Sequence, residues 1–288
     1  MSSGNIVVLG VIAGVTIFIG LPIGRLSSKS TSLRAALNAV TIGILLFLLW
    51  DVLTHALEPL DAALGAASAG EPGEWLTFAV LAAVFFAAIA LGLLSLVAYD
   101  VWMLRRSARQ REKSARLTPA QILDSQSVRR GPLRLHEPAS RLAFLIAMGI
   151  GLHNFSEGLA IGQSAASGQL SLAVVLVVGF GLHNATEGFG ITAPLAGSGD
   201  KPSWSQLLLL GIIGGGPTFF GTILGQVFVN DLVSTAFLAL AAGSIIYVVL
   251  QLIAVAFKFG KQTHLYVGVL GGLFAGFSTD FIIAAAGG

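Results

Sequence analysis

Eight long, almost uncharged runs of apolar residues set the strongest limit on what this sequence can fold into. A helix needs ~20 apolar residues to cross the hydrocarbon core of a bilayer, and each run reaches that length. Only 10% of the residues are charged, whereas soluble domains carry roughly 25%. The sequence therefore predicts an all-α integral membrane protein with eight transmembrane helices. We expect these helices approximately at residues 5–24, 35–57, 75–104, 142–165, 170–195, 205–229, 232–257 and 263–286.

One longer polar segment, approximately residues 105–140, divides the runs into two parts of a single membrane domain. Residues 1–104 hold the first three runs and residues 141–288 hold the last five. The segment between them is basic, as in RRSARQREKSAR, and we expect it to be a surface-exposed, partly disordered loop. The first residues lack the positive leader of a cleaved signal peptide, so we expect the first run to remain as a span. The chain has no cysteine, which excludes disulfides and thiolate metal sites.

The basic residues predict how the helices are oriented across the membrane. All 16 lysines and arginines fall in the first, third, fifth and seventh connections between runs. Connections rich in these residues stay on the cytoplasmic side. Both termini are therefore expected to be extracytoplasmic, in a multi-pass protein of the cell (inner) membrane. This topology accounts for the basic segment without a nucleic-acid partner.

A twelve-residue motif occurs twice in the middle of the apolar sequence. GLHNFSEGLAIG at 151–162 returns as GLHNATEGFGIT at 181–192, so His, Asn and Glu recur in the same order 30 positions apart. The two runs that contain these motifs carry no other charged residues than Glu157 and Glu187. A charged group in the bilayer is costly and marks a candidate functional site.

The spacing within each motif brings its chemistry onto one face of a helix. Residues four apart are neighbours on a helix, so His153 lies beside Glu157 and His183 beside Glu187. With a rise of ~1.5 Å per residue, both pairs fall near the middle of the bilayer. The short link between the two runs makes them antiparallel neighbours. We therefore expect two imidazoles and two carboxylates to converge at one depth.

A divalent cation would explain why two carboxylates are kept at this depth. An isolated charge there costs at least ~2.5–3.5 kcal/mol, and a cation supplies the missing counter-charge. Nitrogen and oxygen ligands in this mixture suit Zn²⁺ and neighbouring transition metals. Alternatively, each His–Glu pair only bonds internally and holds two helices together. The duplication of the pair favours the metal site.

A second group of polar residues lies in the run at 35–57 and just beyond it. Asp51, His55 and Glu58 fall at i, i+4 and i+7, on one face of a helix and in its outer half. They form either an entry or relay site for the ion or protons, or an interfacial His–carboxylate pair that only stabilises the end of the helix. The sequence leaves both interpretations open.

Together with the two motifs, AAGSIIYVVLQL at 241–252 and GVLGGLFAGFSTDF at 268–281 make the sequence resemble the ZIP family of divalent metal transporters. The resemblance implies an inverted repeat in which spans one to three and six to eight surround the central pair. Spans one, four, five and six would move as a unit against the rest, within a homodimer in the bilayer. The cargo would be Zn²⁺, or Cd²⁺, Fe²⁺ or Mn²⁺, moved into the cytoplasm, with no organic cofactor and no enzymatic activity.

The resemblance also implies which residues bind the ion. Carried over by motif position, the metal ligands from span four are His153, Asn154 and Glu157. Those from span five are Asn184 and Glu187, and His183 lines the path.

The sequence departs from the family pattern at four positions. Ser156 and Thr186 replace the motif proline, so we expect no sharp kink in either helix. Gly216 and Gln251 stand where the family commonly has glutamates in spans six and seven. Their lost charge predicts one ion site, or a weak second one, and leaves Gln251 as a candidate relay residue.

Two other functions compete with transport. A non-transporting membrane metal binder, a sensor or a scaffold, would keep the motifs without the glutamates of spans six and seven. An intramembrane metallohydrolase would need a His-Glu-x-x-His pattern, and no glutamate directly follows His153 or His183.

Overall fold

The computed structural model describes residues 3–25, 31–114, 132–135, 137–166, 170–196, 201–227 and 230–285, and all regular structure in them is helical. Within these ranges, the side chains of residues 3, 107, 110–114, 170–176, 179, 182, 183 and 283 lie outside the description. The elements are α1 (Ser3–Val15), α2 (Ile17–Gly20), the 3₁₀ turn η1 (Leu21–Arg25), α3 (Thr31–Ser68), α4 (Glu74–Ser114), α6 (Pro138–Ala166), α7 (Leu170–Thr192), the 3₁₀ turn η2 (Ala193–Leu195), α8 (Trp204–Gly225), α9 (Asp231–Phe259) and α10 (Gln262–Ala285).

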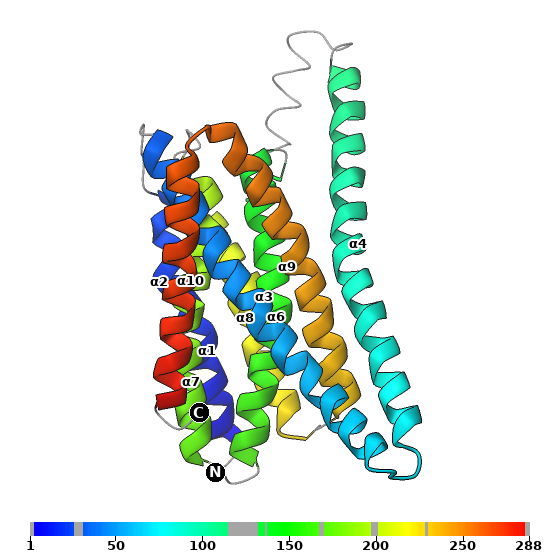
Figure 1. Cartoon of the computed structure of the whole chain (residues 1–288). Coiled ribbons are helices and arrows are strands. Elements are labelled where there is room, and N and C mark those ends of the chain that lie inside the picture. The colour runs from blue at the N-terminus through cyan, green and yellow to red at the C-terminus, as the bar shows by residue number, and fades with distance from the viewer. Residues whose placement is uncertain are drawn as a thin grey trace.

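These elements make eight membrane-length segments, as the sequence predicts. Among the described residues, seven helical segments are long and apolar enough to cross a membrane, the first of them built from α1, α2 and η1. The eighth is α7, a helix of 23 residues. The start of α1 and the end of α10 lie at the same end of the bundle (Figure 1), as an even number of spans requires.

Two helices are longer than the apolar runs indicate. α3 has 38 residues and continues through Pro59 to Ser68, because ALEPLDAALGAAS is rich in the helix formers Ala and Leu. α4 continues to Ser114, into the segment expected to be a loop, because Arg, Gln, Glu and Lys also favour helix. Asp51, His55 and Glu58 therefore lie in the interior of a helix, and not at its end.

The packing of the helices repeats in inverted form. α3 packs against α10, α9 packs against α4, and α1 packs against α8. If the last three spans repeat the first three, α1 corresponds to α8, α3 to α9 and α4 to α10. The contact of α3 with α10 then corresponds to the contact of α9 with α4, and the contact of α1 with α8 corresponds to itself. Spans that lie five apart in the chain cross the membrane in opposite directions. The protein therefore has the inverted repeat that the resemblance implies, with α6 and α7 as the central pair.

Close contacts at glycines confirm this repeat residue by residue. A Cβ atom on Gly43 would clash with the carbonyl oxygen of Val269 in α10, and one on Gly243 would clash with that of Ile89 in α4. Three residues after each of these carbonyls, Gly272 and Gly92 make the reciprocal contacts. Small residues let membrane helices approach this closely. The two helix pairs are built in the same way.

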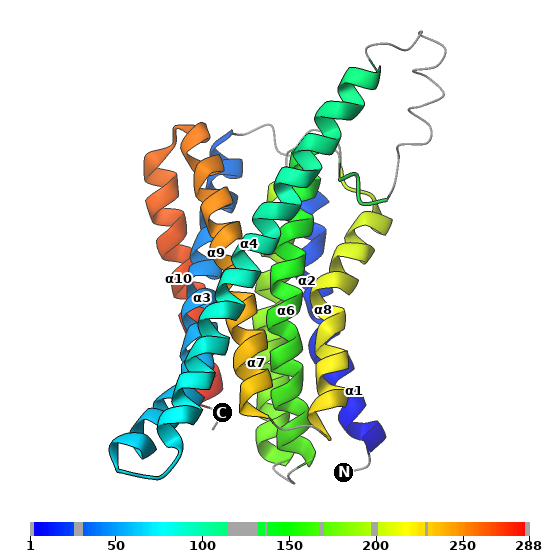
Figure 2. The same ribbon diagram turned by 90° about the vertical axis from the view of Figure 1, so that its right-hand side faces the viewer.

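The same contacts divide the bundle into two groups of helices, which Figure 2 shows side by side. We name α1, α2, α6, α7 and α8 the motif group, and α3, α4, α9 and α10 the flanking group. Among the described glycines, every position where a Cβ would lie within 3.0 Å of another helix meets a helix of the same group. Between the groups, Gly149 and Gly190 make only ordinary contacts, at 3.4 and 3.6 Å.

Two neighbouring glycines test this packing. We expect Gly272→Ala to lower the melting temperature in detergent, because its Cβ would strike the backbone of α3 at Val40, and overpacking costs about 1–3 kcal/mol. Gly271→Ala is the matched control: its Cβ meets nothing within 4 Å, and alanine is the better helix former by roughly 0.5–1 kcal/mol. Equal effects of the two changes would contradict the α3–α10 contact.

Candidate metal site

The motif of α6 places a histidine and a carboxylate together inside the protein. Nε2 of His153 lies 3.2 Å from Oε1 of Glu157, and the two residues are only 3% and 5% exposed. The i, i+4 spacing brings them onto one face, as predicted from the sequence. α6 continues as one helix through Ser156, consistent with a motif that lacks proline.

The motif of α7 lies against the same region. Asn184 and Glu187 are fully buried, and α7 packs along α6. Glu187, together with Asp51 of α3, lies within electrostatic range of His153. The side chain of His183 lies outside the description, so the convergence of all four groups at one depth remains a prediction.

The described His, Asp and Glu side chains do not form a ready-made coordination shell. No three of them come close enough together to hold a metal ion. The His153–Glu157 pair supplies one nitrogen and one carboxylate, and further ligands would have to come from the asparagines, from His183 or from a movement of Glu187. The chemistry of this set, imidazole with carboxylate and amide oxygens, suits a transition-metal ion.

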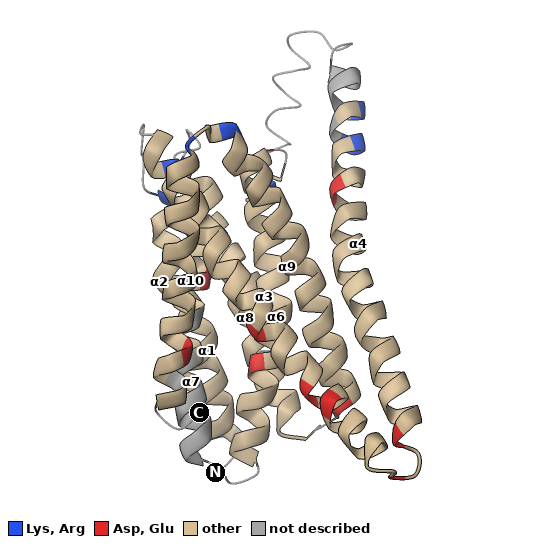
Figure 3. Cartoon of the chain, in the orientation of Figure 1, with Lys and Arg blue, Asp and Glu red and all other residues tan. Residues whose placement is uncertain are grey.

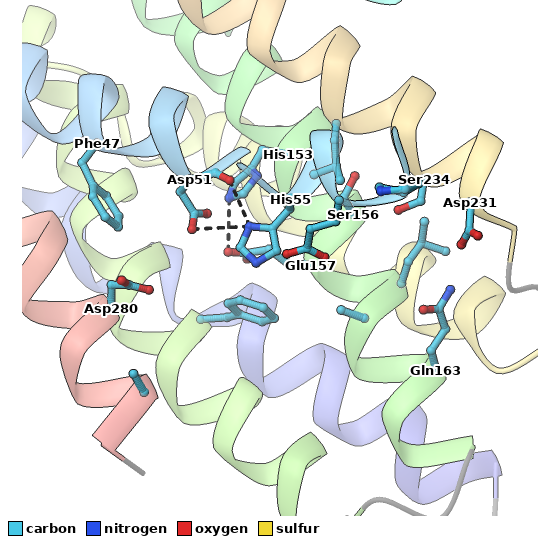
Figure 4. Close-up of a pocket in the computed structure, with 17 residues that line it drawn as sticks. Phe47, Asp51, His55, His153, Ser156, Glu157, Gln163, Asp231, Ser234 and Asp280 are labelled. Carbon is cyan, nitrogen blue, oxygen red and sulfur yellow. Dashed lines mark hydrogen bonds and ion pairs between the residues drawn. The ribbon is translucent and has the colours of Figure 1, made fainter. Parts of the chain in front are cut away.

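A cavity of about 430 Å³ leads to this pair from one end of the bundle (Figure 4). At its mouth Glu58 and Asp231 are exposed, and at its inner end His153 and Glu157 are buried. We name it the acidic vestibule, because its described lining contains five carboxylates and neither Lys nor Arg. The lining residues are Phe47, Asp51, His55, Glu58, Pro59, His153, Ser156, Glu157, Leu159, Ala160, Gln163, Phe180, Asp231, Ser234, Leu238, Asp280 and Ala284.

Asp51, His55 and Glu58 of α3 all line this vestibule. Nδ1 of His55 lies 3.6 Å from Oδ1 of Asp51, and the two side chains are 55% and 18% exposed. The same nitrogen lies 2.9 Å from the backbone oxygen of Asp51. Both residues, with Glu58, therefore share one cavity with His153 and Glu157 although they come from a different helix.

Gln251 does not belong to the vestibule. It lies on α9 beside Tyr247, close to Asp100 of α4. There Arg141 of α6 forms an ion pair with Asp100, with Nε and Oδ1 2.9 Å apart. This ion pair joins the motif group to the flanking group at the end of the bundle opposite the vestibule.

Several vestibule residues were not singled out as site residues by the sequence. Asp231 follows Asn230, whose side chain accepts a hydrogen bond from the backbone nitrogen of Val233, 3.1 Å away, and so caps α9. Asp280 is the only charged residue between Lys261 and the end of α10. A lone charge in an apolar run is a signal of function, and it could have pointed to Asp280.

Comparison with known protein families finds a match that includes both motifs. A family model described as ZIP zinc transporter matches residues 104–284, which include both motifs and α6 to α10. No curated protein sequence matches the chain. The first three spans lie outside the matched range, but they repeat the last three in inverted form. The chain therefore belongs to the ZIP zinc transporter family.

Proposed function

We propose that the protein moves Zn²⁺ into the cytoplasm through a site formed by the two motifs between α6 and α7. Membership of the family carries divalent metal transport by a multi-pass membrane protein, and not an enzymatic activity. The observation that best supports the site is the acidic vestibule, which connects an exposed mouth with the buried His153–Glu157 pair. A cation drawn in by carboxylates would meet its first nitrogen ligand there.

The distribution of charge supports inward movement. The described lysines and arginines gather at the end of the bundle away from the vestibule (Figure 3). By the positive-inside rule that end is cytoplasmic, so the vestibule opens to the outside, on the same side as both termini. Negative lining raises the local concentration of cations at such a mouth.

The two groups of helices suggest how the ion would cross. The vestibule lies between them: the motif group contributes His153 and Glu157, and the flanking group contributes Asp51, Asp231 and Asp280. At the described glycines, the backbones of neighbouring helices pack closely within each group, whereas Gly149 and Gly190 make only ordinary contacts between the groups. Sliding of the motif group would therefore carry the ion with its ligands towards the cytoplasmic end, past a fixed flanking group. Midplane sites in inverted repeats commonly work in this way.

The ligand set leaves selectivity among transition metals broad. Cd²⁺, Fe²⁺ and Mn²⁺ accept similar ligands, and we propose Zn²⁺ as the first ion to test. Gly216 supplies no side-chain ligand, and Gln251 lies away from the vestibule beside Tyr247. We therefore propose one principal ion site.

Zinc uptake into proteoliposomes tests the proposal. We expect vesicles with the protein to accumulate Zn²⁺ down an imposed gradient, above the level of protein-free vesicles made with the same lipids. The initial rate should saturate with Zn²⁺, because the ion must occupy a site. Zinc binding in detergent without any flux would instead favour a membrane sensor or scaffold, and hydrolysis of a peptide bond would favour the metallohydrolase.

A further inference from the structure

Two buried asparagines each bond the backbone of a neighbouring helix. Nδ2 of Asn154 donates to the carbonyl oxygen of Gly214 in α8, 3.0 Å away. Nδ2 of Asn184 donates to the carbonyl oxygen of Ala13 in α1, 2.9 Å away. Both asparagines are fully buried. Each bond joins one helix of the central pair to an outer helix of the motif group.

The two bonds are equivalent under the inverted repeat. A Cβ on Gly158 of α6 would clash with the carbonyl oxygen of Thr218 in α8, and one on Gly188 of α7 would clash with that of Ile17 in α1. In both cases the glycine follows its asparagine by four residues, and the carbonyl follows the one that accepts the amide by four residues. The same construction therefore occurs twice.

The orientation of each amide follows from its partner. A backbone carbonyl can only accept a hydrogen bond, so the amide nitrogen must face it, and the amide oxygen lies on the other branch of the side chain. Oδ1 of both asparagines is buried and has no hydrogen-bond partner among the described residues. A buried acceptor without a partner calls for an explanation, such as an ion or a water molecule.

We propose that Asn154 and Asn184 are positioning residues that fix the metal site to α8 and α1. The proposal rests on the proposed function, since it takes a divalent cation as the occupant. The amide nitrogen holds the outer helix, and the same bond holds the oxygen in place as an uncharged acceptor for the ion. Because both halves of the motif group are tied to the ion's ligands, the ion and these helices move together.

This arrangement explains why amides, and not carboxylates, occupy the two positions. An aspartate has no proton to donate at neutral pH, so its oxygens would repel the carbonyl of Gly214 or Ala13. It would also bring extra charge into the bilayer. An aspartate could still contact the ion, but it could not hold the helix.

Asn38 provides a control within the same chain. Its Nδ2 donates to the carbonyl oxygen of Leu252, 3.1 Å away, and the residue is buried. The bond joins α3 to α9 inside the flanking group, and Asn38 belongs to neither motif. It is the same bond without a metal site beside it.

The test combines two measurements on Asn154→Leu, Asn184→Leu and Asn38→Leu in detergent. We expect all three to lower the melting temperature of the metal-free protein, because each leaves a backbone carbonyl without its amide. We expect Zn²⁺ affinity to fall by about 10- to 100-fold at the first two positions only, as for other groups that orient metal ligands. The visible spectrum of bound Co²⁺ should change in the same two variants and stay unchanged in Asn38→Leu.

Asn154→Asp and Asn184→Asp separate the two roles of the amide. Each restores an oxygen without the donor, so both should melt lower than the wild type while still binding Zn²⁺ more tightly than the leucine variants. Melting temperatures equal to that of the wild type would overturn the bond to the outer helix. Zn²⁺ affinity and a Co²⁺ spectrum unchanged in both leucine variants would overturn the role of the oxygen.

These measurements distinguish the positioning role of the two asparagines from transport itself. Zinc binding that follows the expected pattern, in a wild type without flux, would support the positioning role and remove only the proposed function. Full uptake in Asn154→Leu and Asn184→Leu would overturn the positioning role and leave transport standing.

Discussion

Zinc uptake is expected to fall to the level of protein-free vesicles in both Glu157→Gln and Glu187→Gln. Each change removes one of the two carboxylates in the central helices, and both residues are buried, at 5% and 0% exposure. A divalent ion in a low-dielectric site depends on these charges, because few other groups there can neutralise it. We expect Zn²⁺ affinity in detergent to fall with the uptake, by at least about 100-fold.

The fold should survive both changes. Glutamine has nearly the shape of glutamate, and a neutral amide is cheaper to bury in the membrane than a carboxylate. The melting temperature of the metal-free variants should therefore equal or exceed that of the wild type. Addition of Zn²⁺ should raise the melting temperature of the wild type and leave that of the variants unchanged, since only binding to the folded state stabilises it.

A carboxylate at the mouth of the vestibule is the matched control. Glu58 is exposed and lines the same cavity, so its charge acts on the ion through water. Glu58→Gln should leave the maximal rate unchanged and raise the half-saturating Zn²⁺ concentration modestly, with the difference shrinking as salt is added. Uptake in Glu157→Gln equal to that of the wild type would place the pathway elsewhere.

The sequence predicted the parts of this site that lie close together in the chain. The pairing of His153 with Glu157 follows from a spacing of four residues, and the helical spans follow from their apolar runs. Asp51 and His55 were recognised because they share one helical face. In each case the signal is local.

The vestibule could not be predicted because it is assembled from distant helices. Asp231 begins α9 and Asp280 lies near the end of α10, and only the packing of these helices around α6 brings them to one cavity. The lengths of α3 and α4 were underestimated for a different reason. Apolar runs mark what lies in the bilayer, whereas a helix continues for as long as its residues favour it.

The hydrogen-bond partners of the two asparagines could not be predicted from the sequence either. The resemblance to the family predicted Asn154 and Asn184 as ligands, but the carbonyls of Gly214 and Ala13 carry no sequence signal. Any residue offers such a carbonyl, so the bond depends wholly on how closely α6 approaches α8 and α7 approaches α1. The glycines at those contacts allow this approach.

A disulfide between the two groups of helices is expected to stop transport. The chain contains no cysteine, so Gly149→Cys with Ser244→Cys introduces a single defined pair. A Cβ on Gly149 would lie 3.4 Å from Cβ of Ser244, close to the ~3.5–4.5 Å that a disulfide requires. Gly149 belongs to the motif group and Ser244 to the flanking group. Oxidation should therefore abolish zinc uptake, and reduction should restore it.

A disulfide within the motif group separates arrest of the movement from damage by the bond itself. A Cβ on Gly181 of α7 would lie 4.0 Å from Cβ of Thr16, between α1 and α2, so Thr16→Cys with Gly181→Cys can form the same bond. Because both residues would move together, the oxidised protein should transport zinc at the rate of its reduced form. Zinc binding should persist in both oxidised variants. Full transport by the oxidised Gly149–Ser244 pair would show that the groups do not slide, and the ion would then have to cross a bundle that stays fixed.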